Sequence, residues 1–103
     1  MEIEEFKKVF LEEANKNNIK VNNEELEKLY KYMVGIIEWN NKVNVTAITE
    51  EKLFIVKHFI DSLLINHYLE GKERIIDIGT GGGFPGIPLK IVNAKKKFTL
   101  IVL

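Results

Sequence analysis

Five glycines between residues 79 and 86 constrain this chain more than any other feature; the segment is Gly-Thr-Gly-Gly-Gly-Phe-Pro-Gly. The residues before them, 74 to 78, are mostly β-branched and predict a short strand. Pro85 suits the first turn of a following helix, because its missing N–H has no partner there in any case. Glycines between a strand and a helix let a ligand approach the backbone, and the N–H groups at a helix start favour a polar or anionic group. The segment therefore predicts a site for a nucleotide-like ligand.

Two other interpretations of these glycines stay open. Gly81, Gly83 and Gly86 also satisfy the pattern G-x-G-x-x-G, which is typical of nicotinamide and flavin enzymes. A glycine-rich turn that only lets a strand and a helix pack is the second alternative. A P-loop is excluded, because no Gly-Lys-Ser or Gly-Lys-Thr follows at the required distance.

The residues after the glycines predict a crossover helix and a second strand. The helix is expected to run to about Val92, Lys95-Lys96-Lys97 form a polar connection, and residues 98–103 are apolar or β-branched. Strand, helix and strand make a βαβ unit with parallel strands, and the composition of both strands predicts that they are buried. The predicted fold class is α/β with a helical N-terminal lead.

Three amphipathic helices are expected in this lead. The first spans about residues 3–15 and ends at Asn-Lys-Asn-Asn, because asparagine side chains compete for backbone hydrogen bonds. The second, capped by Asn22 or Asn23, runs to about Trp39 or slightly further, and the third starts near Thr49. Their apolar faces comprise Ile3, Phe6, Val9, Phe10 and Ala14, then Leu26, Leu29, Tyr30, Met33, Val34 and Ile37, then Phe54, Ile55, Phe59, Leu63 and Leu64.

Length and composition limit the class of protein. A chain of 103 residues is one domain at most, so a helical segment (1–70) and the βαβ segment (71–103) are expected to pack as one structural unit. Fifteen basic residues balance fifteen acidic ones, so any RNA contact must come from a local patch. The absence of cysteine excludes disulfides and zinc–thiolate sites. With neither a signal peptide nor a membrane span evident, we expect a cytoplasmic protein with no membrane partner.

The residues from Asp77 to Leu89, Asp-Ile-Gly-Thr-Gly-Gly-Gly-Phe-Pro-Gly-Ile-Pro-Leu, closely resemble the first cofactor motif of the RsmG (GidB) family of ribosomal-RNA guanine-7 methyltransferases. The Phe-Pro-Gly-x-Pro-Leu extension distinguishes this family from most other methyltransferases. Two upstream signatures resemble the family in the same order: Trp39-Asn40 with Asn44-Val45-Thr46, and His58-Phe-Ile-Asp-Ser-Leu63. The resemblance covers nearly the whole chain.

This resemblance implies a Rossmann-like enzyme that uses S-adenosylmethionine to methylate the 7-position of a guanine in 16S ribosomal RNA of the small subunit. The guanine nitrogen has a lone pair and no proton, so the transfer needs positioning more than a general base, and no catalytic residue is assigned. Gly79 and Phe84 are implied to contact the cofactor, and the remaining expected cofactor-binding residues are Thr80, Gly81, Gly83 and Asp77. Asp77 is placed where a carboxylate can accept hydrogen bonds from loop donors.

Other candidate residues have ordinary explanations. His58, Asp61 and Ser62 have the spacing of a hydrolase constellation, but nothing supplies a nucleophile turn or an oxyanion hole, so a hydrogen-bonded structural cluster near the cofactor loop is favoured. The family resemblance leaves their role open between support of the cofactor site and contact with the substrate. His58 and His67 are nine residues apart, and no metal site is expected. Trp39 with Asn40 could stack on or hydrogen-bond RNA bases, but Trp39 is interpreted as a core residue. Residues 44–46 are interpreted as a turn rather than a glycosylation acceptor. Lys95-Lys96-Lys97 could touch phosphates, but they are interpreted as a solvated connection.

The end of the chain departs from the family pattern. Where the family has an acidic residue and a small polar one after the second strand, this chain has Val102 and Leu103, and no carboxylate follows Asp77 to hold ribose hydroxyls. The chain is therefore expected to be a truncated N-terminal portion, inactive alone, that binds the cofactor poorly. The alternative functions are a non-catalytic structural or interaction module and a dinucleotide-binding fragment. An uncovered sheet edge and face also predict self-association.

Overall fold

A computed structural model describes residues 1–43, 51–78 and 86–101 of the chain. Two long helices come first, α1 (Ile3–Lys16) and α2 (Asn23–Val43). A second helical stretch consists of α3 (Glu51–Phe54), the π-helix η1 (Ile55–Ile60) and α4 (Asp61–Leu63). The chain then passes through the short 3-10 helix η2 (Asn66–Leu69) into β1 (Arg74–Ile78), and α5 (Gly86–Val92) precedes β2 (Lys97–Ile101).

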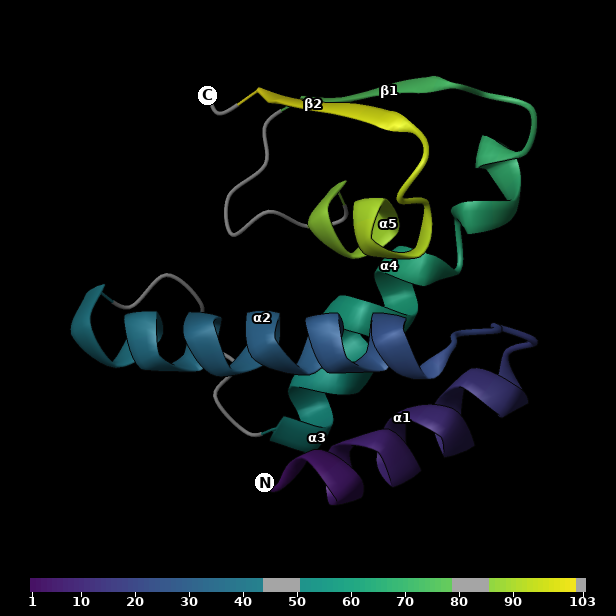
Figure 1. The fold of residues 1–103 in the computed structure, drawn as a ribbon. Helices are drawn as coiled ribbons and strands as arrows, with labels where there is room; N and C mark the ends of the chain where they lie inside the picture. The colour runs from purple at the N-terminus through teal and green to yellow at the C-terminus, as the bar shows by residue number, and fades with distance from the viewer. Residues whose placement is uncertain (44–50, 79–85, 102–103) are drawn as a thin grey trace.

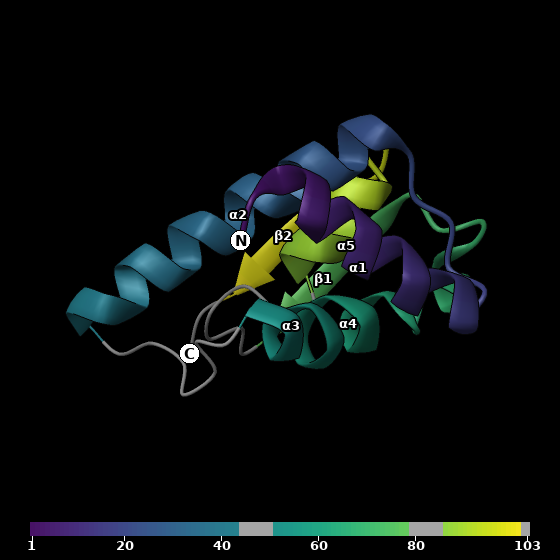
Figure 2. The same ribbon diagram turned by 90° about the horizontal axis from the view of Figure 1, so that it is seen from below.

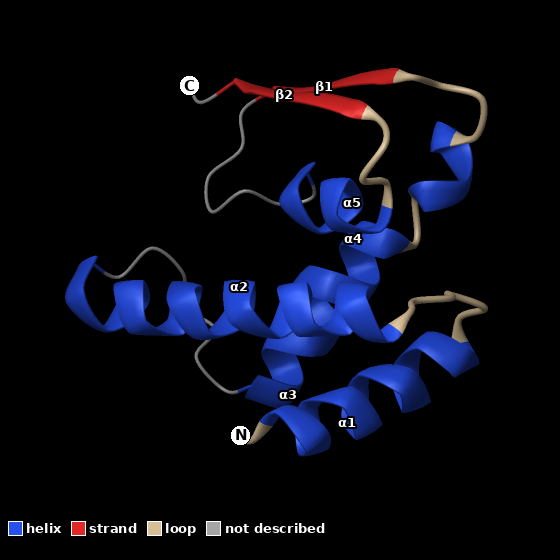
Figure 3. Ribbon diagram, viewed as in Figure 1, coloured by secondary structure: helices blue, strands red, loops and turns tan. Residues whose placement is uncertain are grey.

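The strands β1 and β2 form a two-stranded parallel sheet, as predicted. Arg74 pairs with Lys97 at one end and Ile78 with Ile101 at the other. All described helices lie on one side of this sheet, with α5 directly beneath it and α1 farthest away (Figure 1). The colouring by secondary structure makes the same layering clear (Figure 3). The mixed helical and parallel-strand architecture agrees with an α/β fold.

Local sequence signals explain where the first two helices end and begin. Asn18 adopts φ +56° after α1, a left-handed conformation that asparagine tolerates, and the Ile19 amide donates to the Ala14 carbonyl at 2.9 Å. Asn22 caps α2: its Oδ1 accepts from the Glu25 amide, and Glu25 Oε1 accepts from the Asn22 amide, both at 2.8 Å. This reciprocal pair satisfies two backbone donors that a helix start leaves open.

The core lies where α1, α2 and the stretch from α3 to α4 meet. Viewed from below, α1 lies between α2 and that stretch, with the sheet behind them (Figure 2). Phe59 is central, with ring centroids 6.0 Å from Phe10 and 5.3 Å from Phe54. The buried apolar residues are Phe6, Phe10, Ala14, Leu26, Leu29, Met33, Phe54, Ile55, Phe59, Ile60, Leu63 and Leu89. Leu89 of α5 thus joins the helical layer to the sheet.

The prediction that both strands are buried is wrong. Ile76 is 64% exposed and Ile78 is 65% exposed, and Ile101 beside Ile78 is 40% exposed. An apolar, β-branched composition predicts burial on both faces only when elements cover both faces. The described helices cover one face, so the other face of the sheet is open to solvent.

The interpretation of Trp39 as a core residue is also wrong, because its side chain is 54% exposed. The last turns of α2 extend beyond the other described helices (Figure 1), so the amphipathic pattern continues past the layer that could bury it. α2 itself ends at Val43, about one turn beyond Trp39.

Candidate functional site

Asp77 lies near the carboxyl end of β1 and is the one predicted cofactor residue that the structure describes. Its register partner in β2 is Leu100, and both side chains lie next to Gly86 of α5, so they are on the face of the sheet that α5 covers. The Oδ2 atom of Asp77 is buried and has no hydrogen-bond partner among the described residues. Burying a carboxylate oxygen without a hydrogen-bond partner costs free energy. This oxygen is therefore expected to accept a hydrogen bond from a donor that the described part of the chain does not supply.

Gly86, the first residue of α5, faces Asp77 and Leu100. A Cβ atom at this position would lie 2.7 Å from Asp77 Oδ2 and 2.3 Å from Leu100 Cδ2, closer than side-chain atoms ordinarily approach. Only glycine lets the start of α5 approach the sheet at this distance. The close approach fixes the carboxylate of Asp77 at the position where the glycine-rich segment leaves β1.

The remaining predicted cofactor residues lie outside the described residues, and their roles stay predictions. They are Gly79, Thr80, Gly81, Gly83 and Phe84. Sequence reasoning did not assign Leu100, since nothing in its local pattern marks a residue that packs on Asp77. The role of Gly86 could have been predicted, because Gly86 is the last glycine of the pattern G-x-G-x-x-G and that glycine permits close packing of the helix on the strand.

The structure brings His58, Asp61 and Ser62 onto consecutive turns but not into a catalytic arrangement. Ser62 Oγ donates a hydrogen bond to the backbone carbonyl of His58. The hydroxyl proton is therefore directed to the helix backbone and not to the His58 imidazole. The ring of His58 packs edge-on against Phe54, with centroids 4.8 Å apart. Burial lowers the pKa of His58 below its usual value, and the carboxylate of Asp61 opposes part of that shift. These contacts favour a structural role over nucleophilic catalysis.

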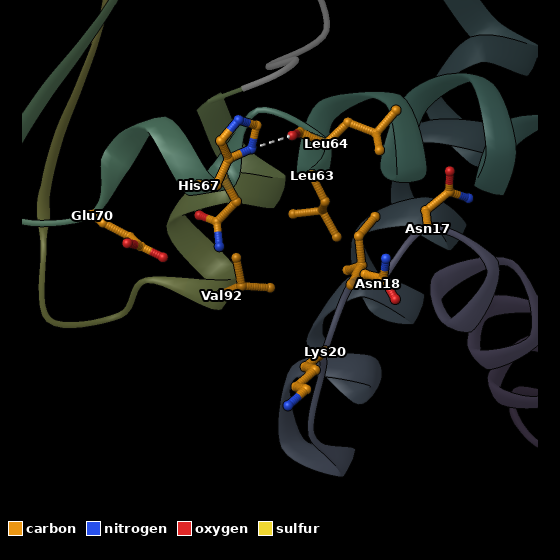
Figure 4. A pocket seen from close by; sticks show the side chains of 10 residues that line it. Asn17, Asn18, Lys20, Leu63, Leu64, His67, Glu70 and Val92 are labelled. Carbon is orange, nitrogen blue, oxygen red and sulfur yellow. Dashed lines mark hydrogen bonds between the residues drawn. The ribbon is translucent and has the colours of Figure 1, made fainter.

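A cavity of about 410 Å³ lies at the other end of α5 from Gly86. Its walls come from the connection between α1 and α2, from α4, η2 and the end of α5, and they include Lys20, Leu63, Glu70 and Val92 (Figure 4). His67 Nδ1 lies 3.0 Å from the Leu64 carbonyl, an interaction that requires the proton on Nδ1. Because Val92 ends the helix that Gly86 begins, the cavity is separate from the environment of Asp77.

Other sequence interpretations have different outcomes. The turn predicted at Asn44-Val45-Thr46 lies outside the described residues, as does Thr49. Of the three lysines predicted to form a solvated connection, Lys95 is exposed in the turn, Lys96 is half-buried, and Lys97 is exposed but is the first residue of β2. Within residues 1–43, 51–78 and 86–101, no cluster of three or more potential metal ligands is present. The described helices also include none with the length and apolarity needed to span a bilayer.

Comparison with known proteins identifies the relatives of this chain. Residues 25–102 match the family GidB, described as rRNA small subunit methyltransferase G. The chain is 46% identical over 100 residues to the ribosomal RNA small subunit methyltransferase G of Dictyoglomus thermophilum, a match that covers 95% of this chain and 42% of that protein. It is 52% identical over 84 residues to the protein of the same name from Desulfitobacterium hafniense, covering 82% of this chain and 35% of the relative. The chain therefore spans less than half the length of these curated relatives.

Proposed function

Because this chain belongs to the rRNA small subunit methyltransferase G (GidB) family, we propose that it serves the reaction implied by its family resemblance. In that reaction a methyl group passes from S-adenosylmethionine to the 7-position of a guanine in 16S ribosomal RNA. The fold proposed with it is the first βαβ unit of a Rossmann-like domain. The observation that carries the proposal is the family match over residues 25–102, which includes the whole glycine-rich segment.

The described residues fit the proposed cofactor. Asp77 presents a buried carboxylate oxygen without a partner among them, at the end of the strand from which the glycines follow. Such an oxygen accepts hydrogen bonds from backbone N–H groups or from an ammonium group. The glycine at position 86 keeps α5 against this carboxylate. S-adenosylmethionine, when bound, supplies a methyl group that a sulfonium makes electrophilic.

In this proposal the protein orients the reactants and supplies no general base. The ring nitrogen of guanine attacks with its own lone pair and has no proton to lose. Holding two reactants in line converts an encounter into an effectively unimolecular step, which is a large part of the rate enhancement available to such an enzyme. Asp77 is proposed to hold the glycine-rich segment in shape by accepting its donors, and Gly79, Thr80, Gly81, Gly83 and Phe84 are proposed to contact or shape the cofactor site.

Titration of the ¹⁵N-labelled chain with S-adenosylmethionine tests the cofactor assignment, because NMR detects even millimolar binding. We expect shifts concentrated in residues 77–86. Asp77→Asn should weaken binding by about 10- to 100-fold, the effect of losing one charge-assisted hydrogen bond. Glu12→Gln is the control, since Glu12 is an exposed carboxylate on α1, the helix farthest from the sheet (Figure 1). Equal weakening by both variants, or shifts confined to the cavity residues, would contradict the assignment.

Deletion of the gene that encodes this chain tests the reaction in cells. If the proposal is right, 16S ribosomal RNA from the deletion strain loses one N7-methylguanine, which is detected as a missing site of chemical strand cleavage. Re-expression of a full-length family member should restore the cleavage site, whereas its variant with valine at the glycine that corresponds to Gly79 should not. Residues 1–103 alone, which are expected to be inactive, should not restore it either. An unchanged set of N7-methylguanines in the deletion strain would refute the reaction.

A further inference from the structure

Charge is distributed unevenly along a chain whose total is balanced. Residues 1–70 contain nine lysines and no arginine against thirteen acidic residues, whereas residues 71–103 contain six basic residues against Glu73 and Asp77 alone. The second group is therefore strongly cationic, although the whole chain has a formal net charge of +0. A local excess of this kind creates a field that a balanced total charge conceals.

The fold gathers these cations at one end of the sheet. Arg74 and Lys97 are the first residues of β1 and β2 and are register partners, so their exposed side chains leave the same face beside each other. Lys95 and Lys96 lie in the turn that leads into β2, and Lys72 lies in the approach to β1. We call Lys72, Arg74, Lys95, Lys96 and Lys97 the amino-end cluster. Both strands begin at this end, away from the end where Asp77 meets Gly86 (Figure 1).

Backbone contacts hold the cluster together without neutralising it. The ammonium of Lys96 donates to the Lys72 carbonyl, and the Lys97 amide donates to the Glu73 carbonyl at 2.8 Å. Lys90 Nζ donates to the carbonyls of Ala94 and Lys96, which adds a sixth positive charge to the same turn. Within the described part of the chain, no carboxylate lies within salt-bridge distance of any of these six side chains, whereas Lys7, Lys16 and Lys28 of α1 and α2 each have an acidic partner.

Placing like charges directly opposite each other in a sheet destabilises it. The fold nevertheless sets Arg74 against Lys97, and no described carboxylate lies within salt-bridge distance of either, so an anion bound here would relieve the repulsion. A single small anion would meet two or three of these charges, but the cluster extends from the sheet face into the turn. A polyanion with regularly spaced charges, such as a nucleic acid backbone, can meet more of them at once, above all the exposed Lys72, Arg74, Lys95 and Lys97.

We propose that the amino-end cluster binds the phosphate backbone of RNA, at a surface separate from the cofactor segment. This inference rests on the proposed function, which makes RNA the substrate. RNA is favoured over an anionic membrane because Tyr68, on the short helix that leads to Lys72, is 71% exposed. One face of its ring packs on His67, with ring centroids 4.0 Å apart, and the other face is left for an unpaired base to stack on. The cluster then holds the RNA in place while a different part of it reaches the site of methylation.

The salt dependence of RNA binding tests this assignment. Binding of the complete chain to a fluorescein-labelled RNA stem–loop is measured by anisotropy at several salt concentrations, without S-adenosylmethionine. Each phosphate contact contributes about 0.7 to 0.9 to the slope of log Kd against log salt concentration. The double variant Arg74→Gln/Lys97→Gln should therefore reduce the slope by about 1.5 and weaken binding about tenfold or more at low salt.

Lys8→Gln/Lys31→Gln is the matched control, because it removes the same net charge from exposed lysines of α1 and α2. It should leave the slope nearly unchanged, as should Arg74→Lys/Lys97→Arg, which keeps both charges. Equal slopes in the Arg74→Gln/Lys97→Gln variant and the unaltered chain would overturn the proposal, and so would equal reductions in both glutamine variants. Tighter binding to phosphatidylserine vesicles than to RNA would identify a membrane surface instead. Because no cofactor or turnover is involved, these outcomes are independent of whether the chain methylates RNA.

Discussion

Asp77 and Gly86 are in such close contact that a Cβ atom at position 86 would lie 2.7 Å from the carboxylate oxygen of Asp77. This contact joins the end of β1 to the start of α5, the two elements between which the glycine-rich segment runs. The position of the segment's two ends therefore depends on the absence of a side chain at residue 86. A change there affects both stability and the predicted cofactor site.

Gly86→Ala should destabilise the chain by about 1 to 3 kcal/mol, because the new methyl group overpacks the space between α5 and the sheet. Gly35→Ala is the matched control: Gly35 lies inside α2, and a Cβ atom there would meet no described atom within 4 Å beyond its own helix backbone and chain neighbours. The free energy of unfolding of that variant should increase by about 0.5 to 1 kcal/mol, because alanine has a higher helix propensity than glycine. Urea denaturation measures both, and equal stabilisation by the two alanines would show that the space at residue 86 is not restrictive.

The lowered pKa of His58 predicts acid sensitivity. Burial favours its neutral imidazole in the folded state, so the unfolded chain binds the proton more readily. Stability linked to His58 is therefore complete above the unfolded pKa of about 6.5 and falls as the pH decreases through the lower folded value. We expect the free energy of unfolding to decrease between pH 7.5 and pH 5 by more in the unaltered chain than in His58→Gln. Identical pH profiles for the two proteins would contradict this.

The N-terminal amine of Met1 should show the opposite pH dependence. It donates to Glu51 Oε1 at 3.0 Å, and this contact is the largest cause of its raised pKa. Because the pKa of the amine is higher in the folded state, its protonated form stabilises the fold at pH values below the unfolded pKa of 8.0. This contribution to the free energy of unfolding is lost as the pH rises through the folded pKa. The stability difference between the unaltered chain and Glu51→Gln should therefore shrink between pH 7 and pH 10. Urea denaturation of the two untagged proteins provides the measurement, and a constant difference would exclude the amine as its source.

Sequence patterns predicted the element types well, because each rested on a local signal. Asn22 is a good cap wherever a helix follows it, and a β-branched run before glycines is a strand in many contexts. The π-helix η1 was not predicted, although a signal exists. Phe54 and Phe59 are five residues apart and both buried, a spacing that turns an α-helix by about 140° but suits the wider π-turn.

Exposure was harder to predict than element type, because it depends on what covers each surface. Isoleucines such as Ile76 and Ile78 occur both in strands that are covered on one face and in strands that are covered on both faces. Their presence therefore does not predict their exposure. The contact between Asp77 and Gly86 likewise depends on the register of β1 with β2, which no local pattern specifies. The grouping of residues 1–70 and 71–103 into one cooperative unit stays a prediction for hydrogen exchange to test.

Self-association is expected through the open face of the sheet. Ile76, Ile78 and Ile101 are all at least 40% exposed and lie on the side away from α5. Burying apolar surface stabilises an association by roughly 25 cal/mol per Å², so replacing one of these side chains with a charge should oppose it. Sedimentation should show a dimer or larger species at high micromolar concentration, and the Ile78→Lys variant should be mostly monomeric. A monomer for both the unaltered chain and the Ile78→Lys variant would contradict the prediction of self-association.

Stability and RNA binding should change in opposite directions when Lys97 becomes acidic. Lys97→Glu places a carboxylate opposite Arg74 and replaces a repulsive cross-strand pair with an attractive one, which should stabilise the sheet by about 0.2 to 1 kcal/mol. The same change removes one phosphate-binding charge and adds a repulsive one, so affinity for the RNA stem–loop should fall. Lys95→Glu is the control for stability, since Lys95 lies in the turn and has no register partner. Urea denaturation and anisotropy on the same preparations provide both quantities. A variant that is more stable but binds RNA as tightly as before would contradict a role for Lys97 in RNA binding. The expected result, higher stability with weaker binding, would show that the positive charge of Lys97 costs the sheet stability and contributes to RNA affinity.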